Sequence, residues 1–87
     1  MNIVSQNKEA LVNTTLVRYF HVHSDAVMAQ MGDNDAVELY KDNNEDNVRE
    51  VFKLLISEIK KRDDWIEMDE LHRKATGEEQ VPGIVIG

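Results

Sequence analysis

Residues 16–23 read Leu-Val-Arg-Tyr-Phe-His-Val-His and residues 26–31 read Ala-Val-Met-Ala-Gln-Met, with the pair Ser24-Asp25 between them. The first run is rich in β-branched and aromatic residues, which favour strands, and a Ser-Asp pair is turn-prone. We therefore predict a hairpin with a two-residue loop, in which Val22 lies opposite Val27 and Phe20 opposite Ala29.

This hairpin has two chemically different faces, because side chains alternate along a strand. The predicted core face is apolar apart from Arg18 at its end and carries Phe20, Val22, Val27, Ala29 and Met31. The opposite face is mixed and carries Tyr19, His21, His23, Met28 and Gln30.

The cluster Gly32-Asp33-Asn34-Asp35 indicates a second turn, followed by a third strand. A three-residue loop at 33–35 would set Val37 opposite Met31 and Leu39 opposite Ala29, on the core face. We expect this register because it keeps the apolar face continuous across three strands.

A long amphipathic helix is predicted after residue 42. Asn43 or Asn44 can cap it, and Glu45 and Asp46 suit the positive end of the helix dipole. The apolar positions at helical spacing are Val48, Val51, Phe52, Leu55, Ile56 and Ile59. Leu54 falls outside this arc, so we expect an exposed leucine edge.

Shorter elements are expected near both ends of the chain. Residues 2–5 and 10–12 read as short strands joined by a polar turn, and Trp65–Met68 as a last strand before a brief helix at 69–74. The predicted fold class is α+β, a small antiparallel sheet of short strands packed against one long amphipathic helix. Residues 1–76 form one domain, and residues 77–87 form an irregular tail whose Ile84-Val85-Ile86 segment packs on a neighbour.

The amino-acid composition excludes several classes of protein. The 87 residues contain no cysteine and carry a net charge of −7. No secretion signal or membrane-spanning run is visible, so we expect a cytoplasmic protein that does not contact a membrane. The negative charge disfavours direct nucleic-acid binding. A chain this short buries only about 60% of its unfolded surface, so oligomerisation would help it.

No catalytic pattern is present. The serines have no nucleophile-elbow or phosphate-loop context, and the carboxylates in the turns are explained by local backbone hydrogen bonding. His21 and His23 lie two residues apart, with His72 elsewhere, which is a weak signal for zinc. We therefore predict a non-enzymatic protein with no metal and no cofactor.

Five residues are candidates for ligand binding. Tyr19, His21 and Tyr40 lie near the mixed face, where aromatic rings can stack on a base. Arg18 and Arg49 can meet phosphate, and they could converge across a homo-oligomer.

The opening Met1 to Lys8 resembles small phage and prophage proteins of Gram-positive bacteria that begin with Met-x-Ile-Ile/Val-Ser-Gln-Asn-Lys. Here Ile3-Val4-Ser5-Gln6-Asn7-Lys8 matches. Residues 46–52 resemble the helix motif Glu-x-Ala-x-Glu-Val-Leu of these proteins, and the resemblance runs to about residue 68. The glycine after Leu39 is missing here, and the tail from Asp69 has no counterpart.

Phage proteins of this layout include immune-signal sponges, which as oligomers sequester cyclic nucleotides or cyclic ADP-ribose. By this architectural analogy we expect a counter-defence protein that binds a nucleotide-derived immune signal. The alternative is an acidic inhibitor of a host defence nuclease, of the anti-restriction or anti-CRISPR type, whose carboxylates imitate nucleic-acid phosphates.

Overall fold

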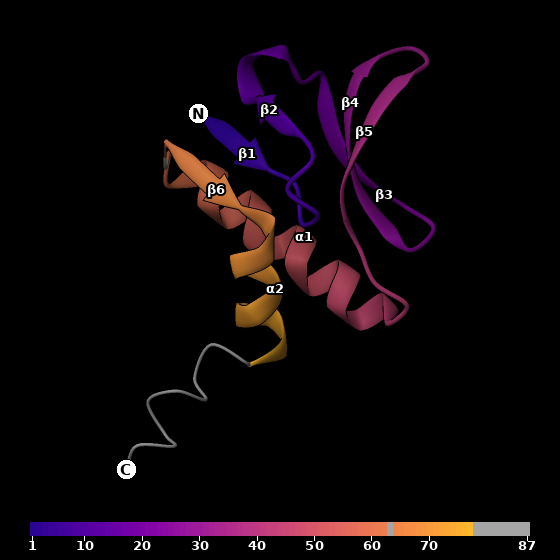
Figure 1. Ribbon diagram of the computed structural model, residues 1–87, viewed down its shortest axis with the longest axis vertical. Helices are drawn as coiled ribbons and strands as arrows, with labels where there is room; N and C mark the ends of the chain where they lie inside the picture. The colour runs from indigo at the N-terminus through magenta and orange to yellow at the C-terminus, as the bar shows by residue number, and fades with distance from the viewer. Residues whose placement is uncertain (63, 78–87) are drawn as a thin grey trace.

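The computed structural model describes residues 1–62 and 64–77. Two three-stranded sheets stand side by side, and α1 crosses beneath them in the view of Figure 1. The elements are β1 (Asn2–Val4), β2 (Leu11–Asn13), the 3-10 turn η1 (Thr14–Leu16), β3 (Tyr19–His23), β4 (Ala26–Gly32), β5 (Asp35–Lys41), α1 (Glu45–Lys60), β6 (Trp65–Glu67) and α2 (Met68–Thr76). The α+β class is confirmed, but the predicted single antiparallel sheet is two sheets, one of which contains a parallel pair. The long helix is followed by α2, where a brief helix was expected.

The first sheet has the strand order β2-β1-β6. β1 pairs antiparallel with β2 and parallel with β6, so it joins the two ends of the described chain. Ile3 lies opposite Val12 on one side and Ile66 on the other, and all three side chains are buried. The parallel pair requires a long crossover, which the second sheet and α1 provide.

The second sheet has the order β3-β4-β5. The predicted hairpin of β3 and β4 is confirmed: Val22 pairs with Val27 and Phe20 with Ala29 around the two-residue loop. Ser24, the first loop residue, has a φ of 58°. A left-handed residue at this position suits a tight hairpin turn.

The predicted register of β4 with β5 is wrong. Gly32 pairs with Asp35 around a two-residue loop, and Ala29 lies opposite Val37 instead of Leu39. The pairing shifts twice, leaving Met31 and Leu39 as extra residues in their strands. The two strands are therefore joined by a two-residue loop and not by the expected three-residue loop. Each strand carries one bulge, and the two bulges compensate each other in register.

α1 begins at the predicted cap. Asn44 is the N-cap, and its side chain accepts a hydrogen bond from the backbone N–H of Asp46. Its buried residues are Val48, Val51 and Leu55, as the spacing predicted. The prediction of an exposed Leu54 is wrong, because Leu54 lies partly buried against the core. α2 packs beside α1 (Figure 1). Ile56, predicted for the core, is exposed instead.

The strand and the helix that follow α1 agree with the prediction in type, and the helix is longer than expected. β6 matches the expected strand, and α2 runs from Met68 to Thr76, longer than the brief helix expected at 69–74. Gly77 ends α2 with a φ of 81°, a left-handed conformation that glycine adopts without strain.

The predicted contact of residues 84–86 with a neighbour falls outside the described residues. No helix of the described part is long and apolar enough to cross a membrane.

Candidate functional site

Three of the predicted binding residues lie together on β3 or directly before it. Tyr19 is 55% exposed, and its ring centroid lies 5.3 Å from that of His21, with the planes tilted by 50°. Nε2 of His21 lies 3.1 Å from the side-chain oxygen of Gln30 on β4. The mixed face of the hairpin thus presents the exposed ring of Tyr19 beside the half-buried ring of His21, which contacts the neighbouring strand.

Arg18 precedes this pair at the open end of the hairpin. Its Nη1 donates to Oδ1 of Asp33 at 2.7 Å, and both side chains are exposed. An exposed ion pair of this kind contributes little to stability, so the guanidinium can exchange Asp33 for another anion at small cost.

Tyr40 does not belong to this surface. Its side chain is 1% exposed, because the bulge at Leu39 turns it toward the core, where it lies opposite Val27. Leu39 is buried to the same extent, so two consecutive strand residues face inward. Strict alternation placed Tyr40 near the mixed face, and the bulge breaks that alternation.

Arg49 is exposed on the first turns of α1. α1 follows the end of β5 that pairs with Ala26, beside the β3–β4 loop. Arg18 lies at the other end of β3, where its backbone N–H donates to the carbonyl of Gln30. Within one chain, the two arginines therefore occupy opposite ends of the sheet.

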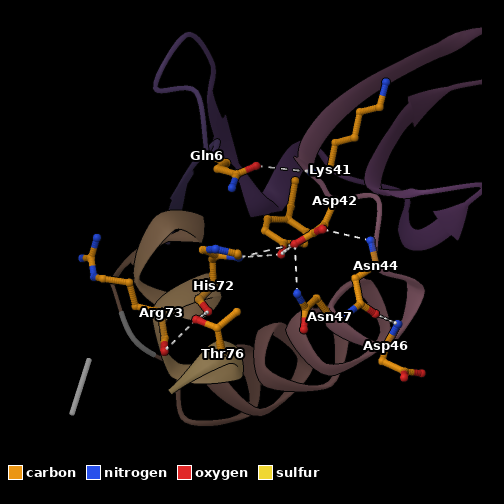
Figure 2. Close-up of polar contacts among 10 residues, drawn as sticks. Gln6, Lys41, Asp42, Asn44, Asp46, Asn47, His72, Arg73 and Thr76 are labelled. Carbon is orange, nitrogen blue, oxygen red and sulfur yellow. Dashed lines mark hydrogen bonds and ion pairs between the residues drawn. The ribbon is translucent and has the colours of Figure 1, made fainter. Parts of the chain in front are cut away.

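A polar cluster that the sequence reasoning missed joins β5, the loop before α1, and α2 (Figure 2). The Tyr40 hydroxyl oxygen lies 2.9 Å from Oδ2 of Asp42 and 2.6 Å from Nδ1 of His72. An ionised carboxylate only accepts, so the hydroxyl donates to Asp42, and the N–H at Nδ1 of His72 donates to the hydroxyl oxygen.

Asp42 is the most heavily bonded member of this cluster. Its Oδ1 accepts from the backbone N–H of Asn44 at 2.9 Å, and its Oδ2 accepts from the Asn47 amide at 3.1 Å. These two bonds lower the pKa of Asp42, and Tyr40 and His72 lower it further, whereas partial burial opposes them. The cluster therefore links three segments of the chain through hydrogen bonds among its own side chains and to the backbone of Asn44.

The described residues contain no pocket, and no group of three or more His, Cys, Asp or Glu side chains within them is placed to hold a metal ion. Comparison of the chain with protein-family models, with curated proteins and with solved structures finds no significant match. The candidate site among the described residues is therefore the ring pair of Tyr19 and His21 together with Arg18, which lies at the same end of the hairpin and bonds to Asp33. We call these three residues the Arg18–Tyr19–His21 surface.

Proposed function

We propose that this protein is a non-enzymatic, phage-derived counter-defence protein that sequesters a nucleotide-derived immune signal on the Arg18–Tyr19–His21 surface. The observation that carries the proposal is the exposed ring of Tyr19, 5.3 Å from the ring of His21 and adjacent in sequence to Arg18. Aromatic rings stack on bases, and a guanidinium binds phosphate through paired hydrogen bonds. The resemblance of Met1 to Lys8 to phage proteins supports the origin.

The chemistry of the surface limits the ligand to one with a base and a phosphate within a single small molecule. Tyr19 offers a ring face for the base, and Arg18 offers the cation after release from Asp33. The net charge of −7 disfavours a long polyanion, since most of the molecule would repel it. A cyclic nucleotide or cyclic ADP-ribose meets both requirements.

The test is isothermal titration calorimetry of the full chain with cyclic dinucleotides and cyclic ADP-ribose isomers. Loss of one base-stacking ring in Tyr19→Ala is expected to weaken binding roughly 5- to 150-fold. Arg18→Gln is expected to weaken binding and to reduce its salt dependence. Arg49→Gln is the matched control, because it removes another exposed arginine, near the far end of the sheet.

Circular dichroism of each variant shows whether it is folded. Binding that is lost in the two β3 variants and retained in Arg49→Gln supports the proposal. Affinity unchanged by Tyr19→Ala and Arg18→Gln, or no binding by any member of the panel, overturns it.

A second candidate is the acidic inhibitor of a host nuclease. The backbone N–H of Asp42 donates to the carbonyl of Asp25 at 3.1 Å, which brings the β3–β4 loop beside the segment 42–46. The carboxylates of Asp25, Glu45 and Asp46 therefore gather at one end of the molecule. Pull-down against restriction and Cas nucleases, repeated over a salt series, tests this candidate, since phosphate mimicry predicts binding that weakens steeply with salt.

A further inference from the structure

β3 is an edge strand, and its outer side has no strand partner among the described residues. The sheet order is β3-β4-β5, and Gln6 covers part of the opposite edge by donating its backbone N–H to the carbonyl of Leu39. Within the described residues, no segment other than β4 supplies β3 with a strand partner. Such an edge is a template for pairing with another chain.

The hairpin geometry fixes which backbone groups face outward. In a two-residue hairpin the pair that flanks the loop, here His23 with Ala26, is hydrogen-bonded, and bonded pairs alternate along the ladder. Tyr19, His21 and His23 therefore direct their backbone groups toward β4. Phe20 and Val22 direct theirs to the open side.

The side chains along this edge suit a protein partner. Val22 is 39% exposed, while Phe20 is partly buried against the core. Edge strands of monomeric proteins are commonly protected by Lys or Pro, and β3 has neither. The two residues that face outward on this extended edge are thus apolar, and no Lys or Pro protects them.

We propose that two copies of this chain pair antiparallel through β3, forming one six-stranded sheet across a two-fold axis at His21. Phe20 of each copy then lies opposite Val22 of the second copy, and both outward-facing residues exchange hydrogen bonds. The two apolar side chains meet on the core side of the joined sheet. The pairing depends on the open edge of β3 and does not require the ligand proposed above, although Arg18 and His21 serve in both proposals.

The structure excludes the neighbouring registers. A shift that pairs Val22 with Arg18 of the second copy fails, because the backbone N–H of Arg18 already donates to Gln30 at 2.8 Å. A shift that pairs Phe20 with Ser24 fails, because Ser24 has a φ of 58° and is not extended. Only the register centred on His21 uses both outward-facing residues of β3.

Charge complementarity supports the same register. Arg18 of one copy falls opposite Ser24 of the second copy, beside the second copy's Asp25, and the two-fold axis repeats this pair. Arg18 is free to reorient, because its present partner Asp33 is an exposed carboxylate with 89% of its side-chain surface accessible. The two ends of β3 therefore carry opposite charges that an antiparallel dimer brings together.

The sharpest test uses single cysteines, since the chain contains none. In the proposed dimer the two copies of residue 21 form a non-hydrogen-bonded pair about 4.5 Å apart between Cα atoms, within disulfide range. His21→Cys is expected to form a covalent dimer under mild oxidation. His23→Cys is the matched control, because the two copies of residue 23 lie about 13 Å apart and cannot be bridged.

Sedimentation of the full chain provides a second measurement. Arg18→Glu and Asp25→Arg are each expected to weaken dimerisation about tenfold, because each turns two attractive pairs into repulsive ones. The double variant is expected to restore the dimer. A wild-type chain that stays monomeric at about 1 mM overturns the proposal. Equal cross-linking of both cysteine variants, or a dimer that neither charge variant weakens, also overturns it.

Discussion

The hydroxyl oxygen of Tyr40 on β5 lies 2.6 Å from Nδ1 of His72 on α2, across a separation of 32 residues. The Tyr40 side chain is 1% exposed, so its ring belongs to the core while its hydroxyl reaches the polar cluster at the core boundary. His72 and Asp42 are each 21% exposed. α2 is therefore held against β5 of the second sheet by a hydrogen bond as well as by packing.

Tyr40→Phe tests how much the hydrogen bonds of the Tyr40 hydroxyl contribute to the stability of the protein. The substitution keeps the buried ring and removes the hydroxyl, leaving His72 without its acceptor and Asp42 with one donor fewer. We expect a loss of about 1 kcal/mol in the free energy of unfolding, because water can replace the hydroxyl only in part. Urea denaturation measures it. Tyr19→Phe, which alters an exposed ring, is the control and is expected to change stability by less than about 0.5 kcal/mol.

Acid sensitivity tests the state of Asp42. Its pKa is lowered in the folded protein from an ordinary value of 3.8, so the unfolded chain takes up the proton at a higher pH than the folded one. The stabilisation from this group is therefore complete above pH 3.8 and is lost as the pH falls through the folded pKa. We expect the urea midpoint of the wild type to fall more steeply below about pH 4 than that of Asp42→Asn. Parallel pH profiles for the two proteins would contradict this assignment.

The sequence predicted local structure well where one strong rule applied. The turn at Ser24-Asp25 determined the register of β3 with β4, and the Asn-rich segment before Glu45 determined the start of α1. Tyr19 and His21 were placed on one face by simple alternation, and their rings do lie together.

What the sequence could not predict depends on tertiary context. Strict alternation gives no sign of the bulge at Leu39, so Tyr40 was placed with the binding residues although it is buried. The parallel pairing of β1 with β6 joins segments more than sixty residues apart, beyond any local pattern. His72 carried no local signal for its contact with Tyr40, because only the packing of α2 brings the two together.

The cap of α1 gives a matched pair of variants. Asn44→Ala removes the acceptor for the backbone N–H of Asp46, and we expect it to lower stability by about 1 kcal/mol. Asn43→Ala removes a neighbouring exposed asparagine that does not cap the helix, and a much smaller change is expected. Thermal denaturation of both variants measures the difference. Equal losses would mean that the cap at Asn44 is not the source of the stability.

Leu54 and Ile56 distinguish the observed packing from the sequence prediction. Leu54 packs partly buried against the core beside α2, whereas Ile56 is 37% exposed. We expect Leu54→Ala to cost about 2 kcal/mol, through lost apolar burial and a residual cavity. Ile56→Ala is expected to cost less than about 1 kcal/mol, because alanine forms helices better than isoleucine and offsets part of the lost contact.

Both variants retain the α1 backbone, so urea denaturation compares their side chains directly. The helical spacing alone predicts the reverse order, with Ile56 the more costly residue, because it treats α1 as covering a single sheet. A larger loss in Ile56→Ala than in Leu54→Ala would contradict the observed burial of these two side chains. The observed order would agree with the structure, in which Leu54 is partly buried against the core and Ile56 is exposed, since the apolar spacing of α1 gives no sign of the burial of Leu54.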